Sequence, residues 1–526
     1  MKSISESRLQ WLLRSFTPTQ ICFIVFGGVL LLFLLKPGKS TIHGAPVHGR
    51  RWRWEPALWL QSRFTSSARK LLRSGWEKYK DQPFIVKRWD VDFHVLPFKY
   101  LDELKRFPES KLSGTRAQFE NVGGKWTGTI LAADSHIHFR AVQLISNNSH
   151  LPKYLKSART EREYAWPLHF HSPKDWELFD IQRAVRGLAA RMYAPSFVGH
   201  PTGRDENFLR FSTDYPVDLI TAAFTIRLFP PWSQSIIAFF LPARHRVLKK
   251  VDLLSQLIKP LIEEHADVAK RRAMGEEVDE EVTVLNWMID NSSAEENRID
   301  KLATRLALVT AAGTHTTTGA IIHIIFDLCT FPEWISVLRE EIESVAKELG
   351  PIESVAEDCL KEWLLRLEKL DSFIIESERI NPQLLLAPQR VAMEPLNLKD
   401  GTHIPEGARI CWSGNSHHND PLITPNPEKF DPMRSYMTRH SSPDQMNKHL
   451  AGQTGLNHLT FGYGKLACPG RYLAINQIKL IISRFITSYD FRFPDNITSR
   501  PRTLDADEFT FLDPSAKIML RLRQDL

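Results

Sequence analysis

A short loop ahead of the last long helical segment constrains this chain more than any other feature. Its sequence is Phe461-Gly462-Tyr463-Gly464-Lys465-Leu466-Ala467-Cys468-Pro469-Gly470-Arg471. The glycines permit a tight turn and let a flat ligand approach the backbone closely. An apolar stripe at helical spacing follows the loop as far as Phe485, and we expect Pro469 at the first position of that helix. The sulfur of Cys468 is therefore expected at a helix N-terminus.

The residues around Cys468 allow three interpretations. A helix dipole and free backbone amides favour a thiolate over a thiol, and a thiolate is a known axial ligand of haem iron. Gly462, Gly464 and Ala467 also match a Gly-x-Gly-x-x-Ala phosphate loop, but only a short apolar segment precedes them and no acidic residue follows at the ribose-binding distance. A lone cysteine is most often a buried structural thiol. Phe-Gly-x-Gly and Cys-Pro-Gly-Arg at this spacing favour the haem ligand.

The loop resembles the haem-binding signature of the cytochrome P-450 superfamily, most closely that of fungal members such as the ent-kaurene oxidase-like group. The resemblance covers roughly residues 50–526. It implies haem b with Cys468 as the axial iron ligand, and Phe461, Gly462 and Gly470 at the cofactor. One residue departs from the pattern, because Leu466 stands where the family usually has a histidine or arginine that bonds a haem propionate. Other cations are then expected to carry more of that charge.

A Glu-x-x-Arg motif lies upstream, at Glu376 and Arg379. Residues three apart share a helix face and can pair, although an isolated surface pair of this kind contributes almost nothing. The segment 426–434, Asn-Pro-Glu-Lys-Phe-Asp-Pro-Met-Arg, follows in the family's order. The resemblance implies that Glu376, Arg379 and Arg434 form a structural triad that fixes the cysteine loop from behind.

Two arginines are candidates for the haem propionates. Arg390 matches a family position with that role, and a guanidinium suits a carboxylate well. The family's Trp-x-x-x-Arg motif is not clearly present between residues 120 and 145, but His136 and Arg140 keep its spacing. Arg140 is therefore the second candidate.

The segment 311–318, Ala-Ala-Gly-Thr-His-Thr-Thr-Thr, lies in a long apolar helical stretch from about Asp300 to Leu328. Glycine and four threonines are poor helix formers, which favours local opening of the helix; a packed helix with threonines bonded to carbonyls is the alternative. By resemblance Thr316 is the oxygen-activating threonine, and His315 replaces the family's acid. Histidine titrates near neutrality, so a proton relay through His315 is still feasible.

The remaining pattern predicts a mainly α chain with a minor β component (α+β), and the resemblance implies the cytochrome P-450 fold. Helical spacing dominates residues 135–350 and 469–487, whereas short β-like pieces occur at 84–87, 91–95 and 385–412. Residues 508–523 have the pattern of a closing pair of strands.

The N-terminal region predicts a membrane anchor. The apolar run from Ile21 to Leu35, extended back to residue 17, is long enough to cross the hydrocarbon core, and no small-residue cleavage site follows it. More basic residues follow the run than precede it, which places the rest of the chain in the cytosol. We predict a lumenal segment 1–16, a transmembrane signal anchor 17–35, a basic linker 36–52 and a cytosolic monooxygenase domain 53–526 at the endoplasmic reticulum. Sequons at Asn147, Asn291 and Asn496 should then remain unmodified.

The composition excludes some classes of function. The net charge is +7, but basic and acidic residues alternate along most of the chain. This favours anionic lipid or an acidic redox partner over nucleic acid. Five cysteines, an odd number without metal-type spacing, argue against a disulfide framework and favour a reducing compartment.

Apolar segments at 228–242, 384–387 and 509–511 predict a pocket for a bulky lipophilic substrate, although core packing is the commoner fate of such residues. The resemblance implies hydroxylation, epoxidation or multiple oxidation of a terpenoid-like secondary metabolite. The co-substrate is O2, and NADPH-derived electrons are delivered through NADPH-cytochrome P-450 reductase. Cytochrome b5 is a further candidate electron donor. The alternatives are desaturation, ring rearrangement or oxidative coupling of an alkaloid or polyketide, a non-catalytic haem-binding protein, and an NAD-dependent dehydrogenase.

Overall fold

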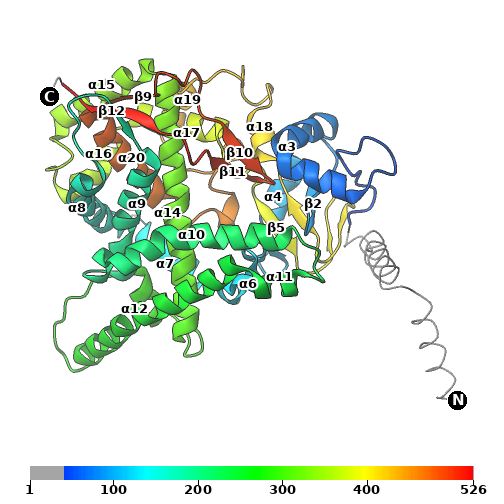
Figure 1. The fold of residues 1–526 in the computed structure, drawn as a ribbon, viewed down its shortest axis with the longest axis horizontal. Helices are drawn as coiled ribbons and strands as arrows, with labels where there is room; N and C mark the ends of the chain where they lie inside the picture. The colour runs from blue at the N-terminus through cyan, green and yellow to red at the C-terminus, as the bar shows by residue number, and fades with distance from the viewer. Residues whose placement is uncertain (1–40, 148, 525–526) are drawn as a thin grey trace, which may run out of the picture.

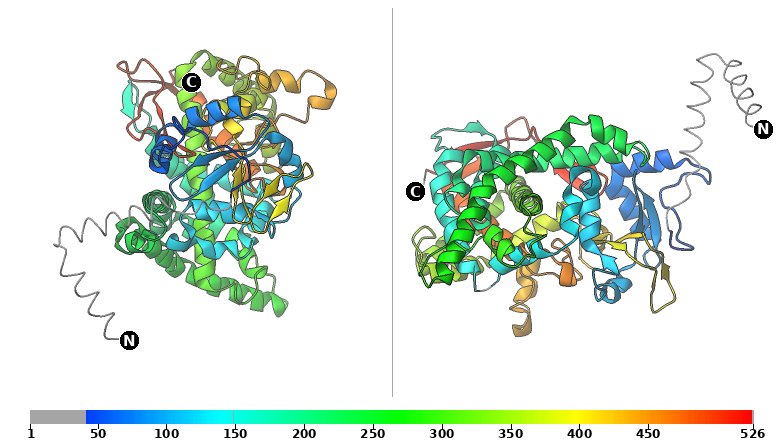
Figure 2. Two further views of the ribbon diagram at one scale, coloured as in Figure 1. Left: turned by 90° about the vertical axis from the view of Figure 1, so that its right-hand side faces the viewer. Right: turned by 90° about the horizontal axis from the view of Figure 1, so that it is seen from below.

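Helix α14 (Ile299–Thr330) runs through the centre of the structure and is seen nearly end-on in the right-hand view of Figure 2. The computed structural model describes residues 41–147 and 149–524. Most side chains of α14 are buried, and most of the buried ones are apolar, as expected for a helix that is covered on nearly all sides. Its main neighbours are α9 (Ile181–Val198), α10 (Glu206–Arg227), α12 (Pro242–Ala273), α17 (Glu368–Ile380) and α20 (Arg471–Ser488).

The other helices surround this centre (Figure 1). They are α3 (Ala57–Lys78), α4 (Leu101–Leu104), α5 (Gly114–Asn121), α6 (Gly124–Thr127), α7 (Ile137–Ile145), α8 (Leu151–His169), α11 (Gln234–Phe240), α13 (Val284–Asp290), α15 (Glu333–Leu349), α16 (Glu357–Leu365), α18 (Gly414–His418) and α19 (Arg434–Arg439). Aspartate caps begin two of the central helices: the Asp180 side chain accepts from the Arg183 N–H at the start of α9, and that of Asp205 accepts from Asn207 and Phe208 at the start of α10.

The strands form small sheets at the periphery. The largest has the order β1 (Phe84–Lys87), β2 (Asp92–Val95), β8 (Arg409–Cys411), β5 (Gln389–Ala392) and β3 (Leu112–Ser113), and only β2 and β8 are parallel. A second sheet has the order β4 (Glu177–Phe179), β12 (Ile518–Leu522) and β9 (Tyr489–Arg492). Two hairpins complete the set, β6 (Leu396–Asn397) with β7 (His403–Ile404), and β10 (Thr503–Ala506) with β11 (Phe509–Leu512).

The predicted class is therefore confirmed for the described residues, with 56% helix and 9% strand. The strands expected near 84–87 and 91–95 are present. The prediction of a closing pair at 508–523 is wrong in one respect. Both strands exist, but β11 pairs with β10 whereas β12 pairs with β9 and β4, because each finds its hydrogen-bonding partner elsewhere in the chain.

The predicted lumenal segment and anchor lie outside the described residues, as does the first part of the linker. Within the described part, no single helix is long and apolar enough to cross a membrane; α14 and α15 together meet that test, with a bend of 118° between them. The four cysteines of this part, Cys329, Cys359, Cys411 and Cys468, are free thiols.

Candidate functional site

The cysteine loop is folded by its own backbone. The Cys468 N–H donates to the Phe461 carbonyl at 2.7 Å, and the Gly462 N–H donates to the Leu459 carbonyl at 2.8 Å. Gly462 and Gly464 have φ values of 78° and 72°. Glycine adopts this left-handed region without a steric penalty, which explains both glycines in the loop. The backbone thus returns Cys468 to the side of Phe461, immediately before α20.

Helix α20 begins later than the sequence suggests. Gly470 is its N-cap and Arg471 its first residue, so the expectation that Pro469 opens the helix is wrong by two positions. The Cys468 sulfur nevertheless accepts from the backbone N–H groups of Gly470 and Arg471. Burial raises the pKa of the Cys468 thiol and outweighs those amides and the Arg471 charge. The helix N-terminus alone therefore does not produce the expected thiolate, whereas a cation bound at the sulfur would favour it.

One stripe of α14 is exposed although the helix is otherwise buried. Ala312 and Thr316 are exposed, and Gly313 and Gly319 are partly exposed. The Thr316 hydroxyl donates to the Ala312 carbonyl at 2.7 Å. The helix is continuous through 311–318, so the predicted local opening is absent and the alternative, threonines bonded to carbonyls, describes the segment. The stripe presents small side chains and one hydroxyl.

His315 lies on the same helix, and its pKa is lowered from the ordinary value of a histidine. Burial and the nearby Arg186 charge lower its pKa to about 4. The imidazole is therefore neutral at physiological pH, and any proton relay through His315 has to use the neutral ring.

The three members of the predicted triad meet. Arg379 Nε and Nη2 donate to the two Glu376 carboxylate oxygens at 2.8 and 2.7 Å, and Arg434 Nε donates to Oε1 at 3.2 Å. The Asp431 N–H also donates to Glu376, at 2.9 Å. Arg379 reaches the Pro427 carbonyl at 2.8 Å. The triad therefore fastens α17 to the segment 425–434 that leads toward the cysteine loop.

Arg390 has the surroundings expected of a propionate ligand. It is buried, and within the described ranges no carboxylate lies at ion-pair distance from it; its Nη1 donates to the Gln389 carbonyl at 2.7 Å. Burial lowers its pKa to about 10. A Cβ on Gly114 would come within 3.0 Å of Arg390 Nη1 and 3.2 Å of Leu466 Cδ1. We call this close approach of side chains to Gly114 the Gly114 cradle. The cradle and the buried Arg390 cation, together with the sulfur of Cys468, fit an anionic haem.

Arg140 lies on α7, which contacts the start of α20: a Cβ on Gly470 would meet Val142 Cγ1 at 3.2 Å. The Arg140 side chain is exposed, and His136 lies 3.4 Å from the Thr115 hydroxyl. The helix therefore passes beside the cysteine loop at Val142.

Two residues near Thr316 were missed by sequence reasoning. The Gln383 side chain donates to the Thr316 carbonyl at 2.8 Å, and the Tyr193 hydroxyl lies 2.8 Å from the Thr317 hydroxyl. Burial raises the pKa of Tyr193. Gln383 follows the Glu-x-x-Arg motif by four residues, which is its only local signal; Tyr193 comes from α9 and has none.

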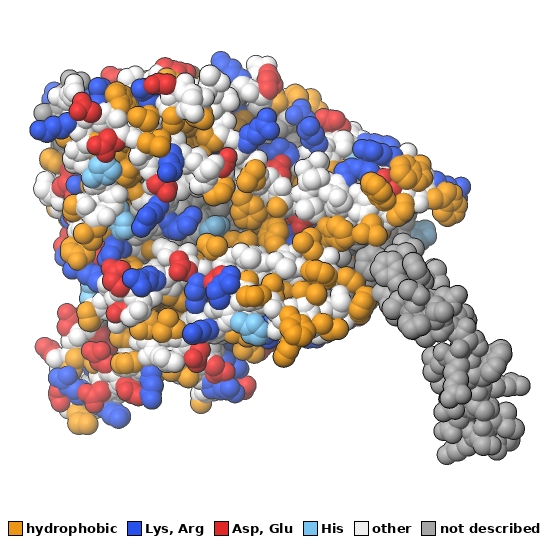
Figure 3. All heavy atoms as spheres, viewed as in Figure 1, with side chains coloured by type: hydrophobic (Ala, Val, Ile, Leu, Met, Phe, Trp, Pro, Cys, Tyr) orange, Lys and Arg blue, Asp and Glu red, His pale blue; other side chains and the backbone are white. Residues whose placement is uncertain are grey.

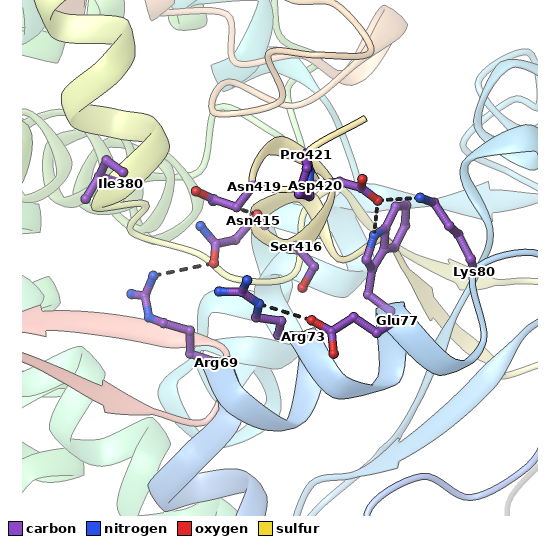
Figure 4. A pocket seen from close by; sticks show the side chains of 11 residues that line it. Arg69, Arg73, Glu77, Lys80, Ile380, Asn415, Ser416, Asn419, Asp420 and Pro421 are labelled. Carbon is purple, nitrogen blue, oxygen red and sulfur yellow. Dashed lines mark hydrogen bonds and ion pairs between the residues drawn. The ribbon is translucent and has the colours of Figure 1, made fainter. Parts of the chain in front are cut away.

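A separate cavity of about 390 Å³ lies between α3 and α18. Its lining includes three basic side chains, and Figure 4 shows that each of them already has a partner: Arg73 contacts Glu77, Lys80 contacts Asp420 and Arg69 contacts Asn415. None of the predicted site residues lines it, so it is not the candidate active site.

Comparison with known proteins identifies the chain. The family model described as cytochrome P-450 matches residues 175–521. The cytochrome P-450 monooxygenase sdnB of Sordaria araneosa is 36% identical over 537 residues, covering 100% of this chain and 96% of the relative. The cytochrome P-450 monooxygenase ATR4 of Stachybotrys chlorohalonatus is 35% identical over 92% of this chain and 91% of its own length. An ent-kaurene oxidase of Fusarium fujikuroi is 30% identical over 96% and 93%.

The chain thus has a mainly helical fold with a cysteine loop at the start of α20, and these comparisons place it among the oxidoreductases. The chain belongs to the cytochrome P-450 family and is a monooxygenase. This membership confirms the resemblance and decides against both a nicotinamide dehydrogenase and a non-catalytic protein.

Proposed function

We propose that this chain binds haem b through Cys468 and inserts oxygen into a bulky, terpenoid-like secondary metabolite. The observation that carries the proposal is the cysteine loop, which places one sulfur beside Phe461 at the start of α20 with a fitting cradle at Gly114 and Arg390. When bound, haem supplies the activation of O2 with electrons from NADPH.

The chain's own residues would divide the remaining tasks. Arg390 and Arg140 would hold the propionates, and Glu376, Arg379 and Arg434 keep the loop in place. The Thr316 hydroxyl lies on the exposed stripe of α14, where it can accept a proton from water and pass one on. Its present bond to the Ala312 carbonyl must break for the hydroxyl to donate to another acceptor. His315 would contribute as a neutral ring.

Aromatic and aliphatic side chains support a lipophilic substrate. Phe224 packs edge-on against Phe509 and Phe511, with ring centroids 5.4 and 5.6 Å apart, and Leu384 pairs with Phe509 through the backbone. Relatives named ent-kaurene oxidase cover almost the whole chain, which favours a terpenoid over an alkaloid or polyketide.

Exposed apolar side chains support attachment to a membrane, in addition to the predicted anchor. They gather on α11 and just before it, and at the start of α3 and on the segment that leads into it (Figure 3): Trp232, Ile236, Phe239, Phe240, Trp52, Trp54 and Trp59. Such a patch suits the interface of a lipid bilayer. We place the protein at the endoplasmic reticulum, single-pass, with the catalytic domain cytosolic and NADPH-cytochrome P-450 reductase as electron donor, assisted by cytochrome b5.

Three measurements test this proposal. Cys468→Ala should abolish the thiolate-type shifted Soret band of the reduced CO complex, while an unchanged band would remove Cys468 as ligand. Metabolite profiling of a strain lacking the gene should show an accumulated terpenoid precursor. Product analysis with the purified protein, reductase and that precursor separates oxygen insertion from desaturation, ring rearrangement or coupling.

A further inference from the structure

Two adjacent carboxylates at the tip of the β10–β11 hairpin are held by two arginines from different parts of the fold. Glu508 accepts from Arg88, which follows β1, and Asp507 lies 2.7 Å from Arg227, the last residue of α10. All four side chains are 5% exposed or less. Figure 1 shows the hairpin beside α10. A buried charge that loses its partner is costly, so these pairs determine where the hairpin lies.

The two arginines are not held equally. Arg88 is also bound by Asp90, through Nε at 2.7 Å and Nη2 at 3.0 Å, and by Asn121 at 3.1 Å. Arg227 Nη2 lies at ion-pair distance from Asp507, but none of the three guanidinium nitrogens makes a hydrogen bond of good geometry within the described part of the chain. Its guanidinium instead covers the Phe224 ring, 3.5 Å from the centroid, and lies 5.5 Å from that of Phe509. Arg88 is therefore held by several hydrogen bonds, whereas Arg227 is held by few polar contacts and can move more easily.

Arg227 contacts a group of three rings, Phe224, Phe509 and Phe511, which we call the aromatic wall. Phe224 precedes Arg227 by three residues on α10, and Phe509 and Phe511 lie on one face of β11. The Arg227–Asp507 pair therefore joins α10 to the hairpin beside these ring contacts.

The same hairpin is tied to the candidate active site. The Thr510 N–H donates to the Gln383 carbonyl at 3.1 Å, and the Leu385 N–H donates to the Glu508 carbonyl at 2.8 Å. The Gln383 side chain in turn donates to Thr316. The aromatic wall is thus positioned, through one short segment, relative to the exposed stripe of α14.

From these contacts we infer that Arg227, through its pair with Asp507, is a positioning residue that sets the aromatic wall and thereby selects among bulky ligands. The inference rests on the proposed function, because it assigns that wall to the substrate pocket. Breaking the pair frees α10 to shift against the hairpin, while Arg88 keeps the hairpin in place.

The test needs no knowledge of the natural substrate. Imidazole and the triaryl azole clotrimazole are titrated into the haem-loaded full-length protein, and binding is followed by the Soret difference spectrum. Imidazole reports the cysteine–haem site alone, whereas clotrimazole also needs the wall. The variants are Arg227→Gln and Asp507→Asn; asparagine suits the φ of 52° at position 507. Arg210→Gln, an exposed arginine of the same helix, is the matched control.

In both variants the clotrimazole dissociation constant should rise about fivefold or more relative to that of imidazole. This factor corresponds to the free energy of the aromatic contacts that clotrimazole would lose. The CO band and the imidazole constant should stay unchanged, and Arg227→Lys, which keeps the charge, should recover part of the loss. A ratio within about twofold of the parent protein in Asp507→Asn would overturn this inference alone. A parent chain that takes up no haem would overturn the proposed function, and the inference with it.

Discussion

The Gln383 side-chain amide donates to the backbone carbonyl of Thr316 at 2.8 Å, across a sequence separation of 67 residues. Gln383 lies three residues past the end of α17, the helix that carries Glu376 and Arg379. The segment that leaves the triad therefore contacts the exposed stripe of α14. This contact couples the support of the cysteine loop to the residue proposed to deliver protons.

Thr316→Ala should reduce the product formed per NADPH consumed by about a hundredfold, the lower end of what a positioned proton donor contributes. NADPH consumption and haem content should change little, because only a hydroxyl is removed. The measurement is product against NADPH, with hydrogen peroxide as the expected by-product. Thr330→Ala is the control, since Thr330 makes the same bond to the carbonyl four residues earlier, to Phe326 at 2.7 Å. Equal effects of both changes would contradict a special role for Thr316.

Arg390→Met should weaken haem retention, since a charge-assisted contact is worth about 1.5–3 kcal/mol. Haem transfer to an excess of apomyoglobin should become roughly tenfold to hundredfold faster. Leu466→Arg should act in the opposite direction, because Leu466 lies next to Arg390 at the Gly114 cradle. Arg183→Met, at an exposed position of α9, is the control. Retention that does not respond to either change would exclude Arg390 as a propionate ligand.

Glu376→Gln should destabilise the fold by about 3–5 kcal/mol, because it leaves Arg379, and in part Arg434, without the carboxylate that both contact. The urea midpoint and the temperature of Soret loss both measure this. Glu340→Gln, on the exposed face of α15, should stay within about 0.5 kcal/mol. A midpoint for Glu376→Gln that matches the control would show that the triad is not structural.

Acid should destabilise the protein before its carboxylates titrate. Burial lowers the pKa of His138, His323 and His418 to about 3, and that of His169 and His315 to about 4. Below pH 6.5 the unfolded chain therefore binds more protons than the folded chain, so stability falls as the pH is lowered toward 4. Each histidine contributes at most about 2 kcal/mol at pH 5.

Two histidines oppose this trend, because hydrogen bonds to carboxylates raise the pKa of His200 and His265 in spite of partial burial. More histidines have a lowered pKa than a raised pKa, so the urea midpoint should be lower at pH 5 than at pH 7. His418→Gln should flatten this slope, whereas the exposed His403→Gln should leave it unchanged. A higher midpoint at pH 5 would contradict the prediction.

The parts of the site that the sequence predicts are those with local patterns. Glu376 and Arg379 share a helix face at a spacing of three, and the cysteine loop has glycines at the two positions with positive φ. What the sequence could not predict depends on tertiary packing. A helix start after Cys468 is visible in the sequence, but the burial that raises its pKa is not. Likewise Arg227 and Asp507 are 280 residues apart by number, and only the fold brings them together.

The glycines of the α14 stripe differ in the room around them. A methyl group on Gly313 would come within 3.3 Å of the Phe197 ring, which is a tight contact, whereas one on Gly319 would meet Gln383 at 3.5 Å, an ordinary one. Alanine is favoured over glycine in a helix interior by about 1 kcal/mol. If this stripe faces the proposed substrate pocket, alanine at position 319 would narrow the pocket without loss of stability, while position 313 would resist enlargement.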